Sequence, residues 1–121
     1  MQKVLLVEDY EGTRKGIERL HRAGNWDFAL YTAGTIHEAY ALFREHKDAS
    51  LIVLDGSIES PLDALDLMEV LELGHGYKGP ILSIAGTEGD REKMLKHGAT
   101  EAFDKMDVSG LFEKIAEILS R

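Results

Sequence analysis

Two short apolar runs in this sequence each end abruptly in carboxylates. Residues 4–7 are followed by Glu8 and Asp9, and residues 51–54 are followed by Asp55. Unbroken apolar runs of this length are typical of strands buried on both faces of a parallel sheet, although periodicity alone leaves a buried helical segment open. We therefore expect two central strands that present acidic side chains at their carboxyl ends.

Segments with helical signals lie between and after these runs. Thr13, Ile17 and Leu20 share one face of a helix that should end near Gly24. Three further helix starts are predicted by N-capping patterns. They are the capping box Thr35-Ile36-His37-Glu38, the pair Ser60-Pro61, and Thr87 with Asp90.

The remaining apolar segments complete an alternating series of strands and helices. Further strands are predicted at residues 28–31, at residues 81–85 and around residues 102–103. A last helix carries one apolar stripe, formed by Leu111, Ile115, Ile118 and Leu119. Five strands that alternate with five helices predict an α/β fold, with a parallel sheet, right-handed crossovers and helices on both faces.

Length and composition limit what such a sheet can belong to. The 121 residues, 44% of them hydrophobic, suit one domain that spans residues 1–121 and has a real core. The formal net charge of -8 leaves no basic face for nucleic acid or an anionic membrane. There is no cysteine, no signal peptide and no apolar stretch near the roughly 18 residues of a membrane span. We expect a soluble cytoplasmic protein.

Charged side chains gather at one edge of the predicted sheet. If the strand order is 2-1-3-4-5, the first and third strands are neighbours, so Glu8, Asp9 and Asp55 converge. Three like charges repel one another, and Mg²⁺ suits a site with few carboxylates and several waters. Lys105, after the fifth strand, could reach the same pocket as a point charge. These groups are what phosphoryl transfer to an aspartate needs.

With these residues in this order, the whole chain resembles a receiver domain of two-component response regulators, most like the stand-alone chemotaxis type. The resemblance implies a flavodoxin-like fold of order 2-1-3-4-5 and phosphorylation of Asp55 by a phosphohistidine of a sensor histidine kinase or phosphotransfer protein. It also implies that Asp9 and Asp55 bind Mg²⁺ directly, Glu8 through water, and Ser57 through its backbone carbonyl. Lys105 would pair with the phosphoryl oxygens.

Several positions depart from the family pattern. Ala85 stands where receivers usually carry a hydroxyl at the end of the fourth strand, and Ala102 stands where they carry the aromatic that responds to it. Ser83 lies one pleat back, about 6.6 Å away, and is a poor substitute. Thr87 could contact the phosphoryl group, but capping of the next helix is favoured. Met106 replaces the usual proline after the lysine.

These residues predict a single-domain response regulator that is not an enzyme beyond assisting its own phosphorylation and dephosphorylation. With no effector domain after Arg121, it would signal through an unknown downstream protein, with no nucleic-acid or membrane partner. The alternative is a pseudo-receiver, an interaction module that acts without phosphorylation, which the losses at Ala85 and Ala102 would tolerate. A flavin-phosphate binder is disfavoured by the Glu8-Asp9 pair, and an aspartate-dependent hydrolase by Ser57 where a second acid is expected.

Overall fold

Five parallel strands form the centre of the computed structural model, which describes residues 1–56 and 64–121. The strands are β1 (Gln2–Val7), β2 (Phe28–Ala33), β3 (Leu51–Asp55), β4 (Ile81–Ala85) and β5 (Glu101–Asp104). Their order in the sheet is β2-β1-β3-β4-β5, and every neighbouring pair is parallel. The predicted strand order and α/β class are therefore confirmed.

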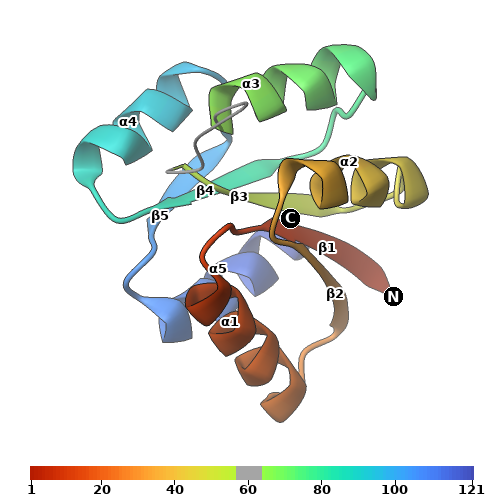
Figure 1. Ribbon diagram of the computed structural model, residues 1–121. Helices are drawn as coiled ribbons and strands as arrows, with labels where there is room; N and C mark the ends of the chain where they lie inside the picture. The colour runs from red at the N-terminus through yellow and green to blue at the C-terminus, as the bar shows by residue number, and fades with distance from the viewer. Residues whose placement is uncertain (57–63) are drawn as a thin grey trace.

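Helices cover both faces of this sheet (Figure 1). They are α1 (Glu11–Ala23), α2 (Ile36–Glu45), α3 (Ala64–Glu69), α4 (Glu88–Lys96) and α5 (Val108–Leu119). Helices α2, α3 and α4 lie on one face, and α1 and α5 lie on the other. None of the helices in the described part of the chain is long and apolar enough to cross a membrane.

The two faces bury separate hydrophobic cores, and alternate strand residues supply them. On β1, Leu5 packs beneath α2, α3 and α4, while Leu6 packs against α1 and α5. On β3, Ile52 belongs to the same core as Leu5, and Val53 belongs to the same core as Leu6. Because both faces are covered, the apolar runs are continuous rather than alternating.

The helix signals in the sequence correspond to real caps where the structure describes them. The hydroxyl of Thr35 accepts a hydrogen bond from the Glu38 backbone at 3.1 Å, and the Glu38 carboxylate reaches back to the Gly34 backbone at 3.3 Å. Thr87 caps α4 by accepting from the Asp90 backbone at 3.1 Å. The predicted cap at Ser60-Pro61 lies outside the described residues.

Two local features were not predicted from the sequence. Of the residues expected on one face of α1, Ile17 is buried but Leu20 is 45% exposed. The helix that begins as α3 does not stay regular to its end. It widens into a π-helical turn, η1 (Val70–Gly74), where the His75 backbone donates to the carbonyl of Val70 at 3.2 Å.

Candidate functional site

The carboxyl ends of β1 and β3 bring three acidic side chains together. These strands are neighbours with Val7 paired to Leu54, so the residues that follow, Glu8 and Asp55, lie side by side. Carboxylate oxygens of Glu8, Asp9 and Asp55 all lie within 4.8 Å of one another. The structure thus places these three predicted residues in one cluster at the edge of the sheet where we expected it.

Glu8 is the most constrained member of this cluster. Its side chain is fully buried, and its backbone donates to the carbonyl of Ala33 at 3.0 Å. Its Oε1 accepts from Lys105 Nζ at 2.9 Å, whereas its buried Oε2 has no hydrogen-bond partner among the described residues. Burial, opposed by Lys105 and reinforced by Asp55, raises the pKa of Glu8 to about 7.

Lys105 joins the cluster from the end of β5. Its Nζ lies 3.0 Å from Asp55 Oδ2 and 2.9 Å from Glu8 Oε1, so one ammonium bridges two buried carboxylates. Burial by itself would lower the pKa of Lys105, but the hydrogen bonds that Lys105 donates to Glu8 and Asp55 outweigh it and raise the pKa. The lysine therefore stays charged beside Asp55.

Asp9 differs from its neighbour because it lies at the exposed mouth of the cluster. Partial burial of its carboxyl, followed by its contact with Asp55, raises its pKa. An exposed carboxylate, a buried carboxylate and an unpartnered buried oxygen on Glu8 form an oxygen-rich site with excess negative charge. This donor set fits a hard divalent cation such as Mg²⁺. Ser57, the predicted carbonyl ligand, lies outside the described residues.

The end of β4 lacks a hydroxyl beside this cluster. Ala85 is fully buried and can offer the site only its methyl and backbone groups. Ser83 is also fully buried, and its hydroxyl has no partner among the described residues. A Cβ built on Gly56 would lie 3.3 Å from both the Ala85 Cβ and the Ser83 hydroxyl, so the Ser83 side chain faces the backbone just after Asp55.

Ala102 does not oppose Ala85 across the two strands. It pairs with Ser83, while Ala85 pairs with Asp104, the residue before Lys105. Thr87 lies on the exposed start of α4, where its hydroxyl is engaged as the helix cap. The arrangement of these residues therefore offers no described hydroxyl group with a contact to Asp55.

Sequence reasoning missed two features of this site. The direct pairing of one Glu8 oxygen with Lys105 was not foreseen, while the expected action of Glu8 on a metal through water stays a prediction. Arg91 was not considered, yet its Nη1 donates to the carbonyl of Ala85 at 2.9 Å and lies 3.8 Å from Asp104 Oδ1. Nothing in the spacing of a polar surface helix distinguishes this arginine from other exposed cations.

Comparisons with known proteins give a result for structure but not for sequence. No family profile matches the chain, and no curated protein matches it. Solved structures match it over nearly its whole length. A receiver domain of a Francisella response regulator has 18% identity and a TM-score of 0.82, covering 100% of this chain and 98% of that chain.

Two further neighbours are similar. The response regulator domain of Thermotoga maritima CheB has 18% identity and a TM-score of 0.77, covering 100% of this chain and 98% of that chain. A LuxR-family response regulator from Aurantimonas sp. SI85-9A1 has 24% identity and a TM-score of 0.79, covering 98% of this chain and 84% of that chain. With its strand order and its five helices, the chain has the flavodoxin-like fold of response regulator receiver domains.

Proposed function

We propose that this protein is a response regulator of a two-component phosphorelay that accepts a phosphoryl group on Asp55. The observation that carries the proposal is the bridge from Lys105 to Asp55 at 3.0 Å, beside a cluster of three carboxylates at the edge of a receiver fold. A buried aspartate held by a cation and surrounded by acids is poorly suited to a purely structural role. It suits a carboxylate that gains and loses a charged group.

The transfer would proceed at the Asp55 carboxylate. One carboxylate oxygen attacks the phosphorus of a phosphohistidine, the P–N bond breaks, and the histidine leaves as an imidazole while an acyl phosphate forms. Lys105 is placed to neutralise charge on the transferring oxygens, because its Nζ already lies 3.0 Å from Asp55 Oδ2. The donor would be a sensor histidine kinase or a histidine phosphotransfer protein.

Glu8, Asp9 and Asp55 would hold Mg²⁺ in this reaction. The bound ion would supply positive charge that offsets the repulsion between the carboxylates and the incoming phosphoryl group. The buried Oε2 of Glu8, for which no hydrogen-bond donor is found in the described part of the chain, supports this assignment, because a buried carboxylate oxygen without a donor is costly unless a cation or water satisfies it. The protein would catalyse no reaction other than its own phosphorylation and dephosphorylation.

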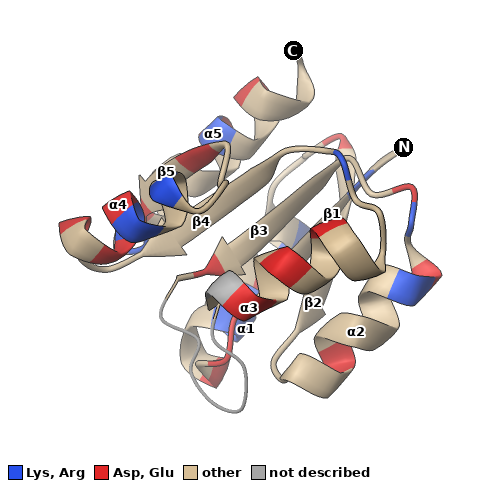
Figure 2. Ribbon diagram, turned by 90° about the horizontal axis from the view of Figure 1, so that it is seen from above, with Lys and Arg blue, Asp and Glu red and all other residues tan. Residues whose placement is uncertain are grey.

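The output would be carried by another protein in the cytoplasm rather than by nucleic acid or a membrane. Lys and Arg residues, 14 in all against 22 Asp and Glu, are spread along several helices and strands (Figure 2). A chain with a formal net charge of -8 is poorly suited to the counterion release that drives binding to phosphate backbones.

A pseudo-receiver that binds a partner without phosphorylation is the second candidate. It is favoured by the alanines at 85 and 102, which leave the last residue of β4 without a hydroxyl and position 102 on β5 without an aromatic ring. The two candidates differ in one chemical outcome, since only the first forms an acyl phosphate.

Intact-mass measurement after incubation with acetyl phosphate and Mg²⁺ separates them. We expect one adduct of about 80 Da that is lost on mild base treatment, as an acyl phosphate would be. Asp55→Asn should abolish it, while Asp27→Asn, which removes an exposed carboxylate elsewhere, should leave it unchanged. Absence of the adduct in folded wild-type protein, with a cognate kinase tried as well, would favour the pseudo-receiver.

A further inference from the structure

Arg91 connects helix α4 to the strand ends beside the candidate site. Its Nη1 donates to the carbonyl of Ala85 on β4 at 2.9 Å and lies 3.8 Å from Asp104 Oδ1 on β5. Among the described residues, Arg91 is the one residue of α4 whose side chain makes a polar contact with another helix or strand. Figure 1 shows α4 beside β5 and β4, so the contact is between adjacent elements.

Both acceptors of Arg91 also hold the backbone on either side of Lys105. The Ala85 carbonyl accepts a second hydrogen bond, from the Lys105 backbone N–H at 3.1 Å. Asp104 Oδ1 accepts from the Met106 backbone N–H at 2.9 Å. A shift of the Lys105 backbone therefore moves the two groups that the guanidinium contacts.

The other end of Lys105 is fixed by the candidate site. Its Nζ is shared between Asp55 and Glu8, at 3.0 and 2.9 Å. Any group added to Asp55 changes the charge and the acceptors around this ammonium. The contacts of Lys105 thus link the chemistry at Asp55 to the turn around Lys105, which Arg91 contacts through Ala85 and Asp104.

Within residues 1–56 and 64–121, no other side-chain hydrogen bond or ion pair from α4 to β4 or β5 is found. Ala85 and Ala102 carry methyl groups, and the buried Ser83 hydroxyl has no partner among the described residues. Met94, one turn beyond Arg91, is buried beside Gly56 and provides an apolar anchor for α4. Helix α4 therefore touches the backbone after Asp55 through Met94 and the turn around Lys105 through Arg91.

We propose that Arg91 is a positioning residue that couples the state of the Asp55 site to helix α4. When the Lys105 turn moves, the hydrogen bond from its guanidinium to the Ala85 carbonyl and its longer ion pair with Asp104 are strengthened or lost. Energetic coupling of this kind is carried by contiguous hydrogen-bonded contacts. The inference rests on the proposed function only for the identity of the group that modifies Asp55.

Hydrogen exchange of the full chain, measured by mass spectrometry over residues 86–97, tests this coupling. The design combines Asp55→Asn, which removes one charge from the Lys105 bridge, with Arg91→Ala in all four combinations. Lys93→Ala is the matched control, because Lys93 is an exposed cation on the same helix without an ion pair among the described residues. Urea denaturation of each variant verifies that it is folded.

We expect Asp55→Asn to change α4 exchange rates by roughly threefold when Arg91 is present and by much less in the Arg91→Ala background. The Lys93→Ala background should retain the full response. Arg91→Lys, which keeps a cation that can reach one acceptor at a time, should restore part of it. A purely structural role would change α4 exchange by the same factor whether or not Asp55 is altered.

An equal response to Asp55→Asn with and without Arg91, or no response in either, overturns the coupling. Acetyl phosphate treatment of wild type, followed by intact mass, judges the proposed function separately. A failure to phosphorylate Asp55 with acetyl phosphate and with a cognate kinase would refute phosphoacceptance, while the four-variant comparison would still decide the role of Arg91. If Arg91→Ala does not fold, the comparison is made with Arg91→Lys against wild type.

Discussion

At the scale of single residues, the site depends on one lysine shared by two buried carboxylates. Glu8 is fully buried, Asp55 is fully buried, and Lys105 bridges them. A buried charge is tolerable only when it is paired, so the three side chains stabilise one another as a unit. Their chemistry and their contribution to folding cannot be separated.

The first prediction concerns loss of this bridge. Lys105→Met should lower the free energy of unfolding by about 3 kcal/mol, because it leaves buried carboxylates without their cation. The double variant Asp55→Asn/Lys105→Met should recover part of this loss, since the buried carboxylate that Lys105 contacts is replaced by a neutral amide. Urea denaturation at neutral pH without Mg²⁺ measures both, and a double variant no more stable than Lys105→Met would contradict the pairing.

The second prediction concerns Mg²⁺. A ligand that binds only the folded state stabilises it, by about 1.4 kcal/mol at a tenfold excess over its Kd. Thermal unfolding with and without Mg²⁺ should show this gain in wild type and in Asp27→Asn. Asp9→Asn should show little of it, because it removes the exposed carboxylate of the cluster. An equal gain in Asp9→Asn would place the ion elsewhere.

At the scale of elements, the described residues of the site lie at strand ends and beside the start of a helix. Thr87 begins α4 two residues after β4 ends, and its hydroxyl accepts from the Asp90 backbone at 3.1 Å. This cap fixes the direction in which α4 leaves the sheet and thereby brings Arg91 over Ala85.

The third prediction tests whether Thr87 acts only as a cap. Thr87→Ala should cost about 1 kcal/mol of stability, and Thr87→Asn, another good N-cap residue, should restore it. If capping is its whole role, both variants should form the Asp55 phosphoryl adduct at the wild-type rate. Slower adduct formation in both would instead assign its hydroxyl to the phosphoryl group.

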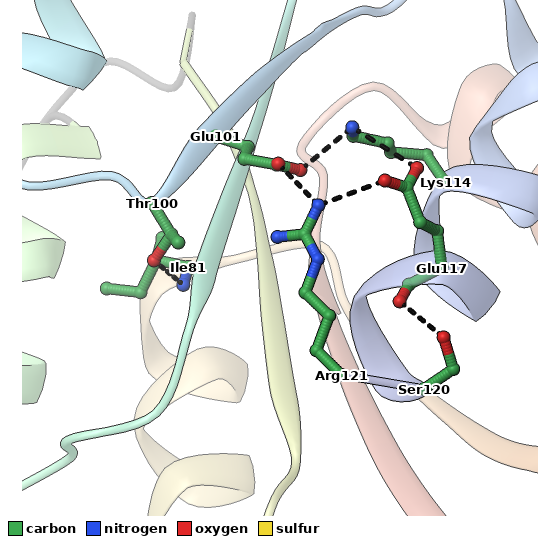
Figure 3. A network of polar contacts seen from close by, with 7 residues as sticks. All are labelled: Ile81, Thr100, Glu101, Lys114, Glu117, Ser120 and Arg121. Atoms are coloured by element: carbon green, nitrogen blue, oxygen red, sulfur yellow. Dashed lines mark hydrogen bonds and ion pairs between the residues drawn. The ribbon is translucent and has the colours of Figure 1, made fainter.

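At the scale of the whole molecule, the last strand and the last helix are joined by a network of ion pairs (Figure 3). Glu101 on β5 pairs with Lys114 at 3.0 Å and with Arg121 at 2.8 Å. Arg121 also pairs with Glu117 at 3.0 Å. This network ties the end of α5 and Arg121 to β5, the edge strand that directly precedes Lys105.

The fourth prediction is the pH dependence of this network. The hydrogen bond from Arg121, followed by Lys114, lowers the pKa of Glu101 from its usual value of 4.5. The network's contribution is therefore fully present above about pH 4.5 and is lost as the pH falls through the lowered pKa. Wild type should be more stable than Glu101→Gln at pH 6, and this difference should shrink towards pH 3.

Urea denaturation across this pH range measures the difference. Glu113→Gln is the control, because Glu113 is an exposed carboxylate on α5 without an ion pair among the described residues. A stability difference between wild type and Glu101→Gln that stays constant from pH 6 to pH 3 would rule out the ionised network as its source.

Much of the fold was predictable from the sequence alone because local patterns carried it. The apolar run at residues 51–54 predicts a strand buried on both faces, and β3 is fully buried. The capping box at Thr35 and Glu38 predicts the start of α2. In the structure the Thr35 hydroxyl accepts a hydrogen bond from the Glu38 backbone and donates one to the Glu38 carboxylate. Such signals are short-range, so neighbouring residues suffice to read them. The π-helical turn Val70–Gly74 has no comparable signal, and it was missed.

The sequence by itself also determined which groups could do chemistry, because Glu8, Asp9, Asp55 and Lys105 follow strands that end at one edge of a parallel sheet. Only the tertiary structure decided which of them touch. Lys105 pairs with Glu8 as well as with Asp55, and Arg91 reaches the Ala85 carbonyl, through contacts between segments far apart in the chain. Pairing between side chains that are far apart in the sequence is set by how helices and strands pack, and no local sequence pattern encodes it.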